Sequence, residues 1–111
     1  MSIEHWSEDV ILVELPGDVE EHHELESVIR MLQQGDRRDV VVDFSHVRVV
    51  HGMWLARLLK IQRLAHELGH KLTLCGLAPA LRGVFTIAHL DTLFEFAEDE
   101  FTALASPQLV G

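Results

Sequence analysis

The spacing of apolar residues changes along this 111-residue chain, and these changes predict where strands and helices lie. Short runs rich in valine, isoleucine, leucine and phenylalanine predict strands at 10–15, 40–44, 72–75 and 93–96, and the segment 3–8 is interpreted as a further early strand. Apolar residues that recur every three or four positions predict helices at about 20–34, at about 53–68, from 79 onward and at 98–105. After two consecutive early strands, the chain is therefore expected to alternate between helices and strands.

Glycine and proline residues mark the ends of the predicted helices. Gly35 and Gly69 end the first and second helices, and Pro79 opens the third. The helical residues expected to face the core share one face of each helix. They are Leu25, Val28, Ile29 and Leu32 in the first helix, Trp54, Leu58, Ile61, Ala65 and Leu68 in the second, and Leu81, Val84, Phe85 and Ala88 in the third.

Two observations indicate the fold class. The strand at 40–44 is apolar on both faces, which is typical of a buried parallel strand. Strands that alternate with helices form a largely parallel sheet, whereas two adjacent early strands imply one antiparallel edge. We therefore expect an α/β fold with a mixed, mostly parallel sheet of about five strands and about four helices. The length suits a single domain over 1–111, with a core at about 3–105 and a loose tail at 106–111.

The chain is acidic, with 9 Lys and Arg against 18 Asp and Glu and a net charge of −9. This balance argues against nonspecific nucleic-acid binding and against docking on anionic lipid, because both require basic residues. No apolar run is long enough to span a bilayer, and the N-terminus lacks the pattern of a signal peptide. The single cysteine, Cys75, lies in an apolar run and is expected to be buried and inert, which favours a reducing, cytoplasmic setting.

The junction between the third strand and the second helix is the most informative part of the chain. A strand that passes into a helix through a short turn places backbone N–H groups and the positive end of the helix at a surface edge. His51, Gly52, Met53 and Trp54 occupy this edge. Trp54 lies on the apolar stripe and is interpreted as a core residue, although a contact role stays open. Met53 lies just off the stripe and is a candidate for partner contact.

His66, Glu67 and His70 match the zinc-peptidase signature H-E-x-x-H, in which two histidines on one helix share a zinc ion. We reject this interpretation because a chain with eight histidines produces the pattern readily by chance, and because Gly69 ends the helix within the motif. Both histidines also lie off the apolar stripe and are expected to face solvent. The pair would at most bind zinc or nickel weakly, so no metal, catalytic group or cofactor is predicted.

Four segments together resemble the STAS domain, which is the fold of bacterial anti-sigma-factor antagonists. They are Val41-Val42-Asp43-Phe44-Ser45-His46-Val47, Leu74-Cys75-Gly76-Leu77-Ala78-Pro79, Gly17-Asp18-Val19-Glu20 and Leu90-Asp91-Thr92-Leu93-Phe94. The resemblance covers about residues 3 to 105. It implies a STAS-like fold and a regulatory role that is exerted by binding another protein.

The chain departs from this family at the position that controls such proteins. In the antagonists, a Ser or Thr at the start of the second helix is phosphorylated by a kinase that is also the anti-sigma factor, and the usual pattern is Asp-Ser-Ser-Gly-Leu. This chain has His51-Gly52-Met53-Trp54-Leu55 there, so Met53 occupies the acceptor position and cannot carry a phosphate. The nearest hydroxyl, Ser45, is interpreted as bonding to the backbone of its turn.

We therefore expect a non-enzymatic, cytoplasmic module that binds a protein partner without the standard phospho-switch. The expected contact residues are Asp18, Glu20, Ser45, His51, Gly52, Met53 and Trp54. The implied partner is an anti-sigma factor kinase that controls transcription. The alternative is a STAS subunit of an ATP-driven lipid transporter or of a sensor assembly. A homodimer stays open, and neither nucleic acid nor membrane insertion is expected.

Overall fold

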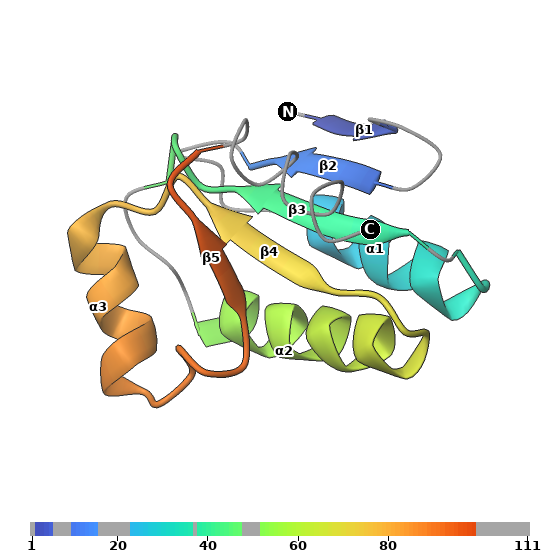
Figure 1. Ribbon diagram of the computed structural model, residues 1–111. Helices are drawn as coiled ribbons and strands as arrows, with labels where there is room; N and C mark the ends of the chain where they lie inside the picture. Colours follow the sequence, from blue (N-terminus) through green and yellow to red (C-terminus); the bar gives the residue numbers. More distant parts are fainter. Residues whose placement is uncertain (1, 6–9, 16–22, 37, 48–51, 100–111) are drawn as a thin grey trace.

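The computed structural model describes residues 2–5, 10–15, 23–36, 38–47 and 52–99. Five strands form one sheet in the order β1-β2-β3-β4-β5. They are β1 (Ser2–His5), β2 (Val10–Glu14), β3 (Asp39–Asp43), β4 (Leu72–Cys75) and β5 (Glu95–Ala97). β1 pairs with β2 in antiparallel orientation, and every other pair is parallel. The predicted mixed sheet with one antiparallel edge is thus confirmed (Figure 1).

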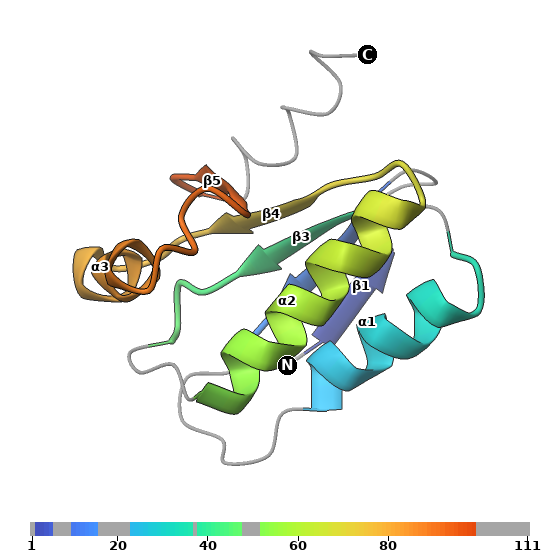
Figure 2. The same ribbon diagram turned by 90° about the horizontal axis from the view of Figure 1, so that it is seen from below.

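Three helices lie within the described residues: α1 (His23–Gln33), α2 (Gly52–Glu67) and α3 (Pro79–Ile87). Figure 2 shows α1 and α2 side by side on one face of the sheet, whereas α3 lies beyond the β5 edge. An ion pair joins the first two helices, because Arg57 Nη2 donates to Glu26 Oε1 at 2.5 Å. The layer that covers this face of the sheet is therefore built from α1 and α2.

The sheet is buried on both faces around β3. Val40, Val41 and Val42 are all 0% exposed. Val40 and Val42 belong to the main core under α1 and α2, whereas Val41 belongs to a second buried cluster with Val10, Leu12 and Cys75. The continuous apolar run of this strand thus reflects burial on both sides, as expected for a central parallel strand. The predicted burial of Cys75 is also confirmed.

The inward faces of α1 and α2 follow the predicted periodicity. The buried residues are Leu25, Val28 and Leu32 in α1, and Trp54, Leu58, Ile61 and Ala65 in α2. Ile29 and Leu68 are half-buried and pack against the same core. Burial of these apolar side chains supplies the main favourable free energy that holds the helices on the sheet, at about 25 cal/mol per Å² of apolar surface removed from water.

The prediction for α3 is correct for two of its four core positions. Leu81 and Phe85 are buried, whereas Val84 is 39% exposed and Ala88 is also exposed. A helix at the edge of a sheet is covered along a narrow stripe only, while the apolar pattern of α3 is wider than the surface available to it. The prediction that Val84 and Ala88 face the core is therefore wrong.

A cluster of aromatic rings attaches α3 to the segment that carries β5. Phe85 contacts Phe94 edge-on with ring centroids 5.7 Å apart, and it contacts Phe96 in the same manner at 5.8 Å. The guanidinium carbon of Arg82 lies 4.1 Å from the centre of the Phe96 ring, which adds a cation–π contact. Phe85 is thus the central anchor of α3.

The last predicted strand starts too early. The final strand begins at Glu95 rather than at 93, since Leu90 to Leu93 form a turn in which Leu93 N–H donates to the Leu90 carbonyl at 3.0 Å. The helix expected at 98–105 does not begin at Glu98, where the chain bends and the carbonyl accepts from Gly76 N–H at 3.1 Å. The rest of that predicted helix lies outside the described residues.

Replacement of Phe85 by alanine should destabilise the protein strongly. We expect Phe85→Ala to lower the free energy of unfolding by about 3 kcal/mol or more, because it leaves a cavity against two aromatic rings. Ile87→Ala is the matched control in the same helix, since Ile87 is 81% exposed, and its effect should stay within about 0.5 kcal/mol. Urea unfolding followed by circular dichroism measures both values, and similar losses in the two variants would contradict the assigned orientation of α3.

Candidate functional site

The carboxyl end of β3 is closed by a hydrogen-bonded turn around Asp43. This residue is 8% exposed, and its Oδ1 accepts from the backbone N–H of Ser45 at 2.9 Å and from the Ser45 hydroxyl at 2.7 Å. Val47 N–H donates to the Phe44 carbonyl at 2.9 Å and completes the turn. Aspartate favours such positions because its carboxylate satisfies backbone donors that leave the strand ladder. The hydroxyl of Ser45 thus bonds to a carboxylate, not to the turn backbone as predicted.

The exit of β4 packs directly against this turn. Gly76 has φ +71°, and a Cβ there would lie 2.6 Å from Asp43 Oδ1 and 3.0 Å from the backbone nitrogen of Ser45. Only glycine fits both the backbone conformation and the space, so the exits of β3 and β4 are held together. Asp43 and Gly76 both belong to segments that resemble the STAS family, but the sequence alone predicts no role for either residue. An aspartate at the end of an apolar run, with a serine two residues later, is a sequence signal for this turn, whereas no sequence signal indicates the close approach of Gly76.

The first turn of α2 is anchored beneath the same edge. Trp54 is 4% exposed, and its ring lies 6.5 Å from that of Phe44 at an interplanar angle of 58°. Phe44 is fully buried, and its N–H donates to the Cys75 carbonyl at 2.8 Å. The interpretation of Trp54 as a core residue agrees with this burial. A side chain so enclosed fixes the start of α2 and offers little surface to a partner.

The other predicted contact residues divide between described and undescribed positions. Ser45 is exposed at the edge, Gly52 is the first residue of α2, and Met53 lies in its first turn. Asp18, Glu20, His51 and the side chain of Met53 lie outside what the structure describes. The described part of the edge therefore consists of the Asp43 turn, the exit of β4 and the start of α2.

The opposite, amino end of the sheet is held by charged groups. His70 Nδ1 lies 3.1 Å from Asp39 Oδ1, and the same oxygen accepts from Lys71 N–H at 3.1 Å. Arg38 donates to both carboxylate oxygens of Asp36, at 2.8 Å from Nε and 2.5 Å from Nη2. The hydrogen bond to Asp36 raises the pKa of Arg38 above its usual value, with burial opposing and the charge of Asp36 reinforcing the shift.

These contacts separate the residues of the H-E-x-x-H motif. α2 ends at Glu67, Gly69 has φ +80°, and His70 lies beyond the helix beside Asp39. His66 is exposed on α2, as expected, but His70 is half-buried rather than solvent-facing. The two histidines therefore do not lie on successive turns of one helix, which is the geometry that the zinc-peptidase motif requires. In the described part of the chain, no three His, Cys, Asp or Glu side chains gather as potential metal ligands.

The fold agrees with comparisons to known proteins. A family model described as "Mlab, STAS domain" matches residues 4–95, so the chain belongs to the STAS domain family. A STAS domain protein from Planctomyces limnophilus, described as an anti-sigma-factor antagonist, is 17% identical over 95% of each chain, with a TM-score of 0.80.

Two further solved structures are similar. The anti-sigma factor antagonist SpoIIAA in its unphosphorylated form is 18% identical over 99% of this chain and 97% of its own, with a TM-score of 0.79. An RsbS variant from Moorella thermoacetica is 22% identical over 97% and 96%, with a TM-score of 0.76. At these identities the likeness is one of fold. Among the described residues, none of the helices combines the length and the apolar character needed to cross a bilayer.

Two glycines with similar backbone conformations allow a direct test of the Asp43 contact. Gly69 and Gly76 both have positive φ, but a Cβ at Gly69 would meet nothing within 4 Å. We expect Gly69→Ala to lower the free energy of unfolding by about 1 kcal/mol, which is the cost of the left-handed conformation alone. Gly76→Ala should cost about 2 kcal/mol or more, because its methyl group also displaces the Asp43 carboxylate. Equal losses in urea unfolding would contradict the close approach of β4 to the turn.

Proposed function

We propose that this chain is a non-enzymatic regulatory module that binds a partner protein at the carboxyl edge of the sheet and lacks the Ser/Thr phospho-switch of the anti-sigma-factor antagonists. The family assignment and the antagonist fold of its structural neighbours support the protein-binding role. The partner class favoured by this similarity is an anti-sigma factor kinase, and the module acts in the cytoplasm.

The observation that carries the proposal is the residue in the first turn of α2. α2 begins at Gly52, so Met53 lies where backbone N–H groups are unsatisfied within the helix and the helix dipole is positive. A phosphate here would add nearly two negative charges and would be stabilised by the dipole. A thioether cannot be phosphorylated, so contact at this position depends on apolar burial and does not respond to a kinase.

Ser45 is a poor substitute for the missing acceptor. Its hydroxyl and its backbone N–H both donate to Asp43 Oδ1, so its hydrogen-bonding groups already stabilise the turn. A phosphate on Ser45 would lie beside this carboxylate, and like charges at such a distance repel. The geometry thus favours a structural role for Ser45 and supports a module that is always competent to bind.

A non-enzymatic role is supported by the chemistry at the edge. The carboxylate of Asp43 accepts two hydrogen bonds from Ser45, and Cys75 is buried. At the other end of the sheet, His70 contacts Asp39 rather than sharing a helix face with His66. The Ser45 hydroxyl does lie beside a carboxylate, but the same oxygen also accepts the Ser45 backbone N–H, so the pair closes the turn.

The proposal predicts binding without phosphorylation. The purified protein should form a stable complex with an anti-sigma factor kinase encoded in the same genome, and intact-mass measurement after incubation with ATP should find no added phosphate. Met53→Asp should weaken the complex about tenfold or more, because a charge would be buried at an apolar contact. Met53→Ser should restore a phospho-acceptor and make the complex sensitive to ATP.

The matched control for this experiment is Ile87→Asp. It makes the same kind of apolar-to-acidic change on α3, at a residue that is 81% exposed, and it should leave the complex intact. Thermal unfolding of every variant separates loss of contact from loss of fold. Absence of any complex, or equal binding by the wild type and Met53→Asp, would refute the proposed contact. Phosphate found on Ser45 of the wild type would refute the unswitched mechanism.

A second candidate function is a STAS subunit of an ATP-driven lipid transporter or of a sensor assembly. The same residue favours it, because a module with methionine at the acceptor position suits constant association with a larger complex. Expression together with the products of neighbouring genes distinguishes the two functions. Stoichiometric co-purification with an ATP-binding transport subunit, without binding to anti-sigma kinases, would establish the second.

A further inference from the structure

The outward face of α2 has a charge opposite to that of the whole chain. The protein carries a net charge of −9, yet α2 contains no acidic residue between Gly52 and His66 and holds three of the nine Lys and Arg residues. Arg57 is paired with Glu26 of α1. Lys60 and Arg63 are exposed, and no ion pair to either of them occurs within the described residues. Two cations without an ion pair in the described residues therefore lie on this face, and Glu67, four residues beyond Arg63, is the acidic residue at the end of α2.

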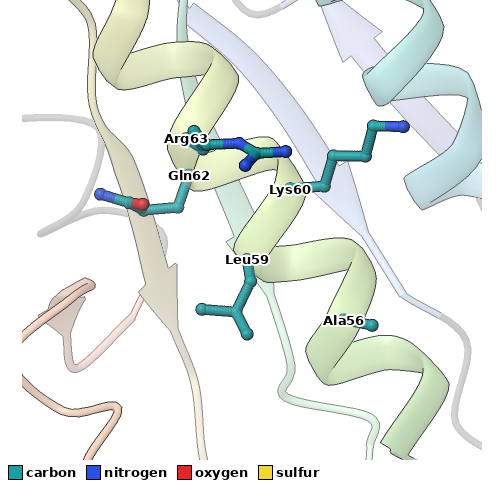
Figure 3. A pocket seen from close by; sticks show the side chains of 5 residues that line it. All are labelled: Ala56, Leu59, Lys60, Gln62 and Arg63. Atoms are coloured by element: carbon teal, nitrogen blue, oxygen red, sulfur yellow. The ribbon is translucent and has the colours of Figure 1, made fainter.

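These cations border a shallow hollow of about 490 Å³ on the same face (Figure 3). Its lining residues are Ala56, Leu59, Lys60, Gln62 and Arg63. Ala56 and the half-buried Leu59 supply apolar surface, while Lys60 and Arg63 extend toward the side on which α1 lies and Gln62 extends to the other. The hollow thus combines an apolar surface with a cationic border.

The spacing of these groups matches another helix. Ala56, Leu59, Lys60 and Arg63 follow the helical pattern i, i+3, i+4, i+7, so they form one stripe opposite the buried stripe of α2. Carboxylates placed three or four residues apart on a facing helix would meet Lys60 and Arg63, and an apolar side chain between them would enter the hollow. A flat acidic surface would interact with Lys60 and Arg63 but would leave the hollow unfilled.

We infer that the outward face of α2, formed by Ala56, Leu59, Lys60, Gln62 and Arg63, binds an acidic amphipathic helix of a partner protein. This surface begins at Ala56, one helical turn beyond Met53, and it does not require the proposed contact at Met53. It gives the module a basic face for an acidic partner segment, and long-range attraction to the two cations would accelerate the encounter.

A membrane and a nucleic acid fit this face less well. Membrane docking requires protruding apolar side chains as well as basic ones, whereas Leu59 is half-buried and Ala56 is short. A phosphate backbone is bound by many cations at once, and two cations on a chain of net charge −9 are too few to offset the repulsion. A single acidic helix needs only a local pair of cations, so it is the occupant that the face favours.

The experiment uses a fluorescently labelled synthetic helix that carries Glu pairs at i and i+4 around central leucines. A peptide of the same composition with the leucines dispersed is the control probe. We expect anisotropy titrations to show salt-sensitive binding of the first peptide. Lys60→Glu and Arg63→Glu should each weaken it about tenfold, because each change replaces one attraction by a repulsion. Arg82→Glu on α3 changes the net charge equally and should alter the affinity less than about twofold.

Each other outcome would overturn the inference. Equal affinity for the two peptides would show that the hollow does not contribute to binding. Equal effects of Arg82→Glu and Lys60→Glu would show that binding depends only on the net charge of the protein. Binding to phosphatidylglycerol vesicles without binding to the peptide would assign the face to a membrane. Self-association that Arg63→Glu abolishes would assign it to a second copy. Met53→Asp should retain peptide binding, so failure at one surface is distinguishable from failure at the other.

Discussion

The structure depends on one carboxylate at the end of its central strand. Asp43 is buried on a protein that is otherwise rich in exposed acids, and it avoids the cost of an unsatisfied charge by accepting two hydrogen bonds from Ser45. Its oxygen also occupies the space that any side chain at Gly76 would need. The exits of β3 and β4 are thereby fixed relative to each other. The contact of Phe44, just after β3, with Trp54 then fixes the position of the first turn of α2.

α2 connects the two surfaces that we assign to binding. Its buried stripe anchors it to the sheet, its first turn reaches the carboxyl edge, and its outward face carries Lys60 and Arg63 beside the hollow. Because one rigid helix carries both surfaces, their relative position is set by packing rather than by flexible loops. The module that we propose would thus discriminate between partners through an apolar contact at the first turn of α2 and through charge along its outward face.

α3 illustrates where a pattern and a fold differ. Its apolar residues cover a wide face, yet Leu81 and Phe85 are buried whereas Val84 and Ala88 are exposed. The periodicity of apolar residues predicts which of them can be buried, but the size of the neighbouring surface determines how many of them are buried. The same limit affects the H-E-x-x-H motif, because the letters cannot indicate that α2 ends at Glu67 and that His70 contacts Asp39, which is 31 positions away.

Local sequence patterns were enough to predict the order of the five strands and of α1 to α3, the parallel character of most of the sheet, and the buried faces of α1 and α2. These features follow from local spacing, since burial of one helix face or of both strand faces imposes a period on neighbouring residues. Only the tertiary structure decided the contact of Asp43 with Gly76, the pairing of His70 with Asp39, the exposure of Val84 and the hollow beside Lys60. Each of these depends on which distant segments come together, and no local period encodes that choice.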